Sequence, residues 1–234
     1  MKRRLNFLCL CLAFTLALTS APARTPFLVP GKIDPQALIP PPPAPDSLVE
    51  HAEIEVLLNL QIARTPTQVA QARKIQSEDV FVFGSDVVGD WFTASNLPKT
   101  AKFFAQLKED FTPLGHLTKK TFNRRRPPFQ DPRIKPCVEF SDTSSYPSGH
   151  STQSAVWAAL LSVVFPDQAS GFAERAAETR WARVVGGAHH PTDVEAGRIL
   201  GEAEARELLK NPEVQKALAE LQAEVAPFLH KKAA

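Results

Sequence analysis

The chain is poor in cysteine, and little of what it has is available for disulfide formation. Of the three cysteines in 234 residues, Cys9 and Cys11 fall within an N-terminal apolar segment that we expect to be removed. Only Cys137 then remains, so an internal disulfide is excluded. We interpret Cys137 as a small buried apolar residue, with an intermolecular bridge as the minor alternative.

The sequence also lacks a strong excess of either charge. It has 27 basic and 25 acidic residues, and removal of Lys2, Arg3 and Arg4 leaves 27 minus 3, or 24, basic residues. Nucleic-acid-binding proteins normally carry a marked basic excess. We therefore expect no nucleic-acid partner and interpret the positive charge as local, acting on a small anion.

Long hydrophobic runs are absent as well, since no segment reaches the ~20 apolar residues of a membrane-spanning helix. The apolar stretch 5–18 follows a basic opening and precedes the small-residue exit Ala21-Pro22-Ala23. This arrangement is typical of a secretory signal peptide, which we place at residues 1–23. We therefore expect no membrane span and a periplasmic or secreted location.

The remaining chain is long enough for one well-cored domain and shows no internal repeat. Residues 24–46 are rich in proline and predict an extended, polyproline-like arm, or a mere spacer. Residues 47–234 form the predicted domain, with helical periodicity over 47–60, after Asn96, after Ser148, after Thr192 and from Pro212. The predicted fold class is all-α, a compact helical bundle. Only residues 80–83 alternate as a strand does, and they predict a loop or isolated extended piece.

Arg183, His189 and Asp193 form an Arg-x5-His-x3-Asp pattern. On one helix, the four-residue interval from His189 to Asp193 would put both side chains on one face. A carboxylate bonded to one imidazole nitrogen fixes the tautomer and leaves the other nitrogen free to attack. His189 is therefore the candidate nucleophile and Asp193 its partner. Asp193 also fits a helix start, and the two roles are compatible.

Ser148, Gly149 and His150 directly precede the apolar run 155–165 and predict a helix N-terminus. Free backbone N–H groups there attract anions. Gly149 allows close approach of a phosphate, and the Ser148 hydroxyl offers a hydrogen bond. His150 is the candidate general acid that protonates a leaving oxygen.

Lys119 and Arg126 belong to a basic cluster, and such clusters are usually solvated surface. Their seven-residue interval is close to two helical turns, so both side chains can point the same way before Pro127 ends the helix. We expect Arg126 and Arg183 to bind phosphate oxygens while Lys119 adds a point charge. The remaining members of the cluster are interpreted as surface charge or substrate steering: Lys120, Arg124 and Arg125.

The other histidines carry no predicted chemical role. We interpret His190 as packed or exposed rather than as a substrate contact, since neighbouring helix residues point in different directions. No role is expected for His51, His116 and His230. A site dominated by cations would repel a metal ion, so we expect neither a metal nor another cofactor.

The three motifs Lys-x6-Arg-Pro, Pro-Ser-Gly-His and Arg-x5-His-x3-Asp, in this order, resemble the PAP2 (phosphatidic acid phosphatase type 2) superfamily. Within it they resemble the bacterial class A nonspecific acid phosphatases. Further stretches at 38–43, 83–87, 97–100 and 135–137 extend the resemblance over most of the chain. One departure is Ala182, because the family usually has serine before the arginine of its third motif. That change removes one hydroxyl near the phosphate and bears on affinity rather than on mechanism.

The resemblance implies metal-independent hydrolysis of small-molecule phosphate monoesters in two steps. His189 takes the phosphoryl group, His150 protonates the departing alcohol, and water then hydrolyses the phosphohistidine. The remaining site residues neutralise charge on the phosphate oxygens: Lys119, Arg126, Ser148, Gly149 and Arg183. Because His189 must be neutral and His150 protonated, the expected pH profile is bell-shaped with an acidic to near-neutral optimum.

Two alternatives stay open beside a phosphatase. A vanadate-dependent haloperoxidase is one, because that group resembles the superfamily in its oxyanion site; compact length and the N-terminal resemblance favour a phosphatase. A non-catalytic phosphate-binding protein is the other, although we would expect it to lack His150, His189 or Asp193. The preferred ester, phosphotransferase activity and formation of a homo-oligomer are also left open.

Overall fold

The computed structural model describes residues 25–28 and 31–229, and no strand occurs within these ranges. The all-α prediction is confirmed. The predicted signal peptide at 1–23 lies outside the described residues. The helices are α1 (Pro35–Leu38), α2 (Leu48–Ala63), α3 (Pro66–Gln76), α4 (Val80–Val88), α5 (Pro98–Phe122), α6 (Pro127–Gln130), α7 (Gly149–Val164), the 3₁₀ turn η1 (Pro166–Gln168), α8 (Ala169–Val185), α9 (Pro191–Lys210) and α10 (Pro212–Leu229).

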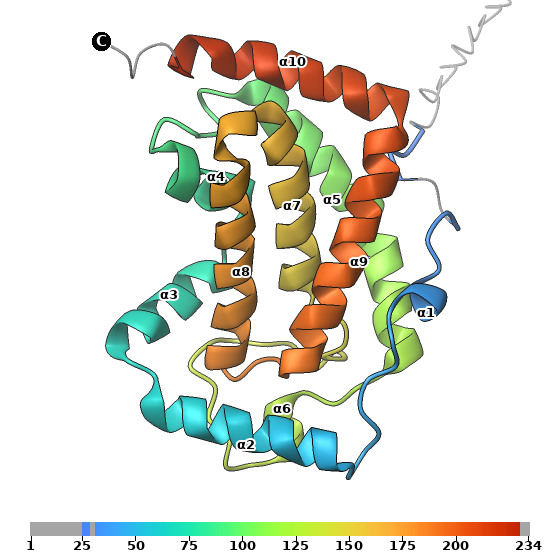
Figure 1. The fold of residues 1–234 in the computed structure, drawn as a ribbon, viewed down its shortest axis with the longest axis vertical. Coiled ribbons are helices and arrows are strands. Elements are labelled where there is room, and N and C mark those ends of the chain that lie inside the picture. The colour runs from blue at the N-terminus through green and yellow to red at the C-terminus, as the bar shows by residue number, and fades with distance from the viewer. Residues whose placement is uncertain (1–24, 29–30, 230–234) are drawn as a thin grey trace, which may run out of the picture.

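Helices α7, α8 and α9 stand side by side as the central layer, with α10 across one end and α2 across the other (Figure 1). The contact between α7 and α9 depends on two glycines of α9. A Cβ atom at Gly197 would collide with the carbonyl oxygen of Ser148, and one at Gly201 with that of Thr152. Glycine at both positions therefore lets the two helix backbones approach closely.

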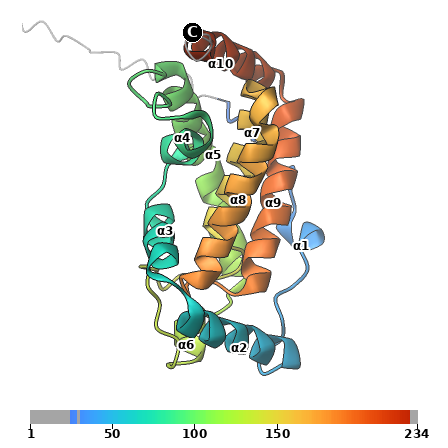
Figure 2. The same cartoon turned by 60° about the vertical axis from the view of Figure 1, so that its left-hand side comes forward.

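The largest apolar cluster lies between the upper parts of the central helices and α4, α5 and α10 (Figure 2). Its aromatic centre is Phe83, whose ring centroid is 6.3 Å from that of Phe172 and 5.5 Å from that of Trp157. Leu160 and Leu161 of α7 are fully buried in the same cluster. This end of the bundle is a packed apolar core, and the polar site lies at the other end.

The loop predicted at residues 80–83 is wrong, because these residues begin α4. Asp79 caps the helix, and its Oδ1 accepts hydrogen bonds from the backbone N–H groups of Phe81 and Val82, both at 2.9 Å. Val80, Phe83 and the later Val88 are buried. Four residues of alternating pattern are too few to separate a strand from a helix, and the cap decides in favour of the helix.

The described part of the proline-rich arm runs along α9 and is extended apart from the single turn of α1 (Figure 1). Ile39 is buried against Tyr146 and Leu200. The hydroxyl of Tyr146, the one tyrosine in the chain, donates a hydrogen bond to the carbonyl oxygen of Pro40. The arm therefore packs on the body of this chain.

Cys137 is half-buried beside an apolar cluster that includes Ala182 and Ile75. It is the single free cysteine of the described residues. Among the helices that the structure describes, none combines the length and the apolar character that crossing a bilayer requires.

Candidate active site

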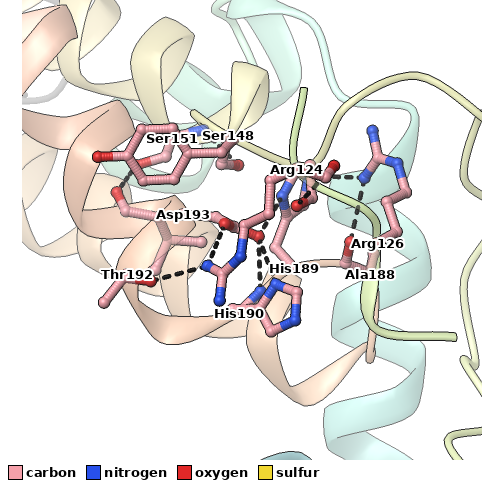
Figure 3. A network of polar contacts seen from close by, with 12 residues as sticks. Arg124, Arg126, Ser148, Ser151, Ala188, His189, His190, Thr192 and Asp193 are labelled. Atoms are coloured by element: carbon pink, nitrogen blue, oxygen red, sulfur yellow. Dashed lines mark hydrogen bonds and ion pairs between the residues drawn. The ribbon is translucent and has the colours of Figure 1, made fainter. Parts of the chain in front are cut away.

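The predicted site lies at the end of the bundle next to α2, where α7 and α9 begin and α8 ends (Figure 1). Figure 3 shows Arg126, Ser148, His189 and Asp193 there. One cavity of about 1160 Å³ is lined there by six of the predicted site residues: Lys119, Arg126, Gly149, His150, Arg183 and His189. The other two, Ser148 and Asp193, are fully buried and do not line it. Segments far apart in the sequence thus supply one concave polar site.

His189 is buried and lies between Arg126 and Asp193. Its Nε2 is 3.0 Å from a terminal nitrogen of Arg126, and its Nδ1 is 3.5 Å from Oδ2 of Asp193. A guanidinium only donates hydrogen bonds, so Nε2 accepts and Nδ1 carries the proton of the neutral ring. Burial lowers the pKa of His189 well below its usual value, with Asp193 opposing the change. The ring is therefore neutral, and its free lone pair is on Nε2, which faces Arg126.

The predicted helical relationship between His189 and Asp193 is wrong, although the two side chains do meet. His189 precedes α9, and Asp193 is the third residue of that helix. Asp193 accepts a 2.8 Å hydrogen bond from the backbone N–H of His190, the residue that precedes and caps the helix. Asp193 therefore serves both roles expected of it, as a helix-start residue and as a neighbour of the His189 ring.

Arg124 is buried, so its interpretation as surface charge or steering was wrong. Its guanidinium lies 2.7 Å from Oδ1 of Asp193 and 2.7 Å from Oε2 of Glu53, and it donates to the Thr192 hydroxyl at 2.8 Å (Figure 3). Lys120 and Arg125 are exposed, as expected for the remainder of that cluster.

The carboxylate of Glu53 completes a closed set of contacts around Arg124. Its Oε1 accepts a 2.7 Å hydrogen bond from the backbone N–H of Thr192. Glu53 lies on the buried face of α2 together with Ile54 and Leu57. Glu50 is buried in this helix too, and acidic residues among the apolar positions of 47–60 were a sequence signal for such contacts.

His190 is fully buried, which agrees with packing and not with exposure. Its Nδ1 is 3.0 Å from Oδ2 of Asp193, and its Nε2 is 2.8 Å from Oε1 of Gln130. The Gln130 side chain donates in turn to Oε1 of Glu50 at 2.9 Å. His190 thus faces away from the cavity and links Asp193 to α6 and α2.

Asp193 is therefore surrounded by donors on every side that the structure describes. Burial alone would raise its pKa, but the contacts of His189 and His190 hold the pKa well below its usual value. The side chain is therefore an anion at mildly acidic and neutral pH. Its negative charge faces Nδ1 of His189 and favours a positive charge developing on that ring.

His150 is the second residue of α7, the helix capped by Ser148. Its Nε2 lies 3.2 Å from the carbonyl oxygen of Gln76, so Nε2 carries a proton. Burial, and next the positive charge of Arg183, lowers the pKa of His150 to about 4. The Gln76 side chain also accepts a hydrogen bond from Arg183. Gln76, the last residue of α3, thus contacts both His150 and Arg183. The sequence did not suggest this role for α3.

The three predicted phosphate-binding cations are bound to neutral oxygens instead of carboxylates. Lys119 donates to the Ser144 carbonyl at 2.7 Å, and Arg126 donates to the Thr143 and Ala188 carbonyls, both at 3.0 Å. Within the described part of the chain, none of Lys119, Arg126 and Arg183 forms an ion pair with an acidic residue. Nε of Arg183 has no partner at all.

Burial lowers the pKa values of these three cations, and mutual repulsion adds to this for Lys119 and Arg183. Burial, and next Arg126, lowers the pKa of Lys119 to about 8 and that of Arg183 to about 10. Burial also lowers the pKa of Arg126. A group of buried cations without counter-charge is a site for an anion.

The predicted single helix carrying Lys119 and Arg126 is not observed. Helix α5 ends at Phe122, followed by Asn123 in the left-handed conformation with φ 44°, and Arg126 is extended. The chain reversal at Asn123 nevertheless returns Arg126 to the cavity that Lys119 lines. The pairing was therefore right, but for a different reason.

A helix begins at Gly149, as predicted, and Gly149 lines the cavity. A Cβ atom on Gly149 would meet no other atom within 4 Å, so the space next to its backbone is open. The Ser148 hydroxyl instead accepts a hydrogen bond from the N–H of Ser151 at 3.4 Å and caps the helix. Ser148 also donates its own N–H to the Asp193 carbonyl at 2.9 Å, which ties α7 to α9 at the site.

The described residues contain no group of three or more histidine, cysteine or acidic side chains placed to hold a metal ion. Ala182, at the position where serine was expected, packs in an apolar cluster with Ala72 and Ile75. Its side chain does not line the cavity.

Comparison with known proteins agrees with this arrangement. Residues 110–212 match the PAP2 superfamily model, and this range contains all eight predicted site residues. The chain is 32% identical over 219 residues to a non-specific acid phosphatase of Salmonella typhimurium, covering 88% of this chain and 86% of that protein. It is 29% identical over 202 residues to a non-specific acid phosphatase of Providencia stuartii, with 83% and 82% covered. A shorter match, 37% over 92 residues, joins it to a lipid A 1-phosphatase of Rhizobium johnstonii, with 38% of each chain covered. By its sequence and by the residues that it gathers at one end of the bundle, the chain belongs to the PAP2 superfamily.

Proposed function

We propose that this protein is an acid phosphatase that hydrolyses small-molecule phosphate monoesters through a phosphohistidine intermediate. The observation that carries the proposal is a group of cations next to a neutral His189, in which Arg126 and Arg183 are buried and Lys119 is half-buried. Burial of unpaired charge is costly, and a phosphate dianion supplies the missing charge. The names of the relatives support the same activity.

In the first step, Nε2 of His189 forms a bond to phosphorus while the bond from phosphorus to the ester oxygen breaks. The electron pair of that bond leaves with the alcohol oxygen, which His150 protonates. Arg126, which donates to Nε2 in the free enzyme, transfers its hydrogen bond to a phosphoryl oxygen. Asp193 then stabilises the positive ring through Nδ1.

In the second step, water attacks phosphorus and His150 accepts one of its protons. The bond between phosphorus and Nε2 breaks, its electron pair returns to the nitrogen, and inorganic phosphate leaves. Throughout both steps the backbone N–H of Gly149 and the three cations neutralise charge on the phosphoryl oxygens. No step requires a metal ion.

The low pKa of His150 in the free enzyme, about 4, is set by burial and by the positive charge of Arg183 and its neighbours. A bound phosphate dianion opposes that positive charge and raises the pKa of His150 in the complex. The proton for the leaving group is therefore acquired as substrate binds. This is consistent with an acidic to near-neutral optimum and a bell-shaped profile.

For the location we propose the periplasm or the extracellular space. The support is the basic opening before the apolar stretch 5–18 and the small residues at 21–23. Expression of the full chain in a bacterium, followed by fractionation and N-terminal sequencing, tests this. Recovery of a shortened chain outside the cytoplasm supports it, and a full-length cytoplasmic chain contradicts it.

The activity is tested with p-nitrophenyl phosphate and the purified protein lacking residues 1–23, in excess chelator, with vanadate as inhibitor. His189→Ala is compared with the wild type. His51→Ala is the matched control, because His51 is exposed on α2 away from the cavity. We expect chelator-resistant, vanadate-sensitive turnover in the wild type and the control, and a loss of at least about a thousandfold in His189→Ala.

Turnover that survives His189→Ala rules out the phosphohistidine. Absence of wild-type turnover redirects the test to bromide oxidation with vanadate and peroxide, and then to equilibrium phosphate binding. Turnover that chelator abolishes contradicts metal independence.

A further inference from the structure

Glu204 of α9 is a buried carboxyl group that the phosphatase mechanism does not use. It is 3% exposed, and it lines the same cavity as His189 and Arg183. Within the part of the chain that the structure describes, no hydrogen bond or ion pair is formed by its side chain. Burial is the sole cause that raises the pKa of Glu204, to about 8. An acidic residue at such a position destabilises the fold, which points to a use in binding.

The place of Glu204 relative to the phosphate site follows from the packing of α9 on α7. Gly201 lies against Thr152 and Ala155, so Glu204, three residues further, is level with Val156 in the next turn. Val156 is seven residues from Gly149, or roughly 10 Å along the helix. The backbone of Glu204 therefore lies about 10 Å further along the bundle than the start of α7 at Gly149.

Part of the cavity wall is apolar, although Lys108 and Thr112 of α5 and Gln153 of α7 line it too. Leu107 and Phe111 of α5, Val156 of α7 and Leu200 of α9 all line it. Three further carboxyl groups line the cavity, but Glu78 pairs with Arg175, Asp79 caps α4 and Glu139 is exposed. The cavity thus has a cationic end at Lys119, Arg126 and Arg183 and, at Glu204, one buried carboxyl group without a partner among the described residues. A ligand that complements both ends carries a phosphate, an apolar segment and a positive group.

We propose that Glu204 recognises the alcohol portion of the substrate and takes a protonated amine, so that the site prefers phosphate monoesters of amino alcohols with an apolar spacer. This inference rests on the proposed function, whose site binds the phosphate. A bound ammonium group lowers the pKa of Glu204, so the side chain releases its proton and the carboxylate pairs with the amine; ion pairing is strong where water is excluded. No such gain is available to a methyl group at the same position.

Equilibrium binding of three chain-matched phosphonates, which cannot be hydrolysed, tests the inference by isothermal titration calorimetry at near-neutral pH. They are 7-aminoheptylphosphonate, 7-hydroxyheptylphosphonate and n-octylphosphonate. We expect the amine to bind about tenfold more tightly than the octyl compound. In Glu204→Leu we expect this ratio to invert, and in Glu204→Gln to fall toward one. The ratio of the amine to the octyl affinity is taken on one protein at a time, so changes that affect all three ligands cancel. An apolar and a polar variant are both used, so that one is still available if the other folds poorly.

Glu207→Gln is the matched control, because Glu207 lies on the same helix, pairs with Lys210 and does not line the cavity. It should keep the wild-type ratio. Equal binding of amine and octyl compounds, a preference that persists in Glu204→Leu, or an equal gain for the hydroxyl compound each overturns the inference. p-Nitrophenyl phosphate turnover is measured on the same samples, so failure of the proposed function and failure of this inference are seen separately.

Discussion

Arg124 and Asp193 form a buried ion pair, with 2.7 Å between a guanidinium nitrogen and Oδ1. Both side chains are almost fully removed from solvent, and Oδ2 of the same carboxylate faces His189 and His190. Arg124 therefore fixes the rotation of the carboxylate and supplies permanent positive charge behind the proposed nucleophile. It acts through Asp193 and does not line the cavity.

Substitution Arg124→Gln leaves the Asp193 charge without its main partner. The carboxylate then attracts a proton to His189 more strongly, so the pKa of His189 rises. Because attack requires neutral His189, the acidic limb of kcat/KM moves to higher pH. We expect kcat to fall by at least about a hundredfold near pH 5, with partial recovery as pH increases, measured as a full pH profile.

The variant should also be less stable, since breaking a buried pair costs roughly 3–5 kcal/mol. A merely structural role would lower stability and leave the limb where it was, and that outcome contradicts the prediction. Arg125→Gln is the control because Arg125 is exposed next in the chain. Its profile should match that of the wild type.

Much of the fold is predictable because its helix starts are local. Ser47 caps α2, Ser148 caps α7, and Pro212 opens α10, as the short-range patterns indicated. α4 was missed because its first four residues, 80–83, fit both a period of 2 and a helix. Only the Asp79 cap and the burial of Phe83 in the core separate the two.

The site was predictable where its residues belong to short sequence motifs. The convergence of His150, Arg183 and His189 on one cavity followed from them. The position of Arg124 did not, because its partners Glu53 and Asp193 are distant in the sequence and their meeting depends on how α2 crosses the bundle (Figure 1). Tertiary ion pairs of this kind leave no periodic signal.

The close contact of α7 and α9 predicts opposite results for two glycine substitutions. Gly201→Ala places a methyl group against the Thr152 carbonyl and Ala155, so we expect a loss of about 1–3 kcal/mol in the free energy of unfolding. Gly115→Ala in α5 meets nothing within 4 Å and should gain about 0.5–1 kcal/mol from helix propensity. Urea denaturation measures both. A stable Gly201→Ala variant would show that the helices are free to separate at this point.

The lowered pKa of Lys119, about 8, predicts an alkaline limit to substrate binding. As pH rises through that value, the free enzyme loses one of its three phosphate-binding cations, so KM increases and kcat/KM falls. Lys119→Arg should move this limb to higher pH, because a guanidinium stays protonated. Lys102→Arg, a change at an exposed residue of α5 that does not line the cavity, should not. A KM that stays constant to pH 10 in the wild type would refute the assignment.

Glu204 predicts that the folded protein loses stability as pH rises from about 5 to 8. The pKa of Glu204 is raised by burial from 4.5 to about 8, so the folded state holds a proton that the unfolded state has released. Stability then decreases with pH across this window, because the unfolded state binds fewer protons. The loss assigned to this one group is on the order of 2–4 kcal/mol at pH 8.

Other groups titrate in the same window, so the quantity to compare is the difference between wild type and variant. Glu204→Leu removes the titration and adds apolar burial, and its stability advantage should grow from pH 5 to pH 8. Glu204→Gln cannot titrate either and keeps a polar group, so its pH dependence should match that of Glu204→Leu at lower absolute stability. Urea denaturation at several pH values gives both curves. If the difference in unfolding free energy between variant and wild type does not change with pH, Glu204 is solvated or paired in solution. That result would also contradict the proposed recognition of an amine by Glu204.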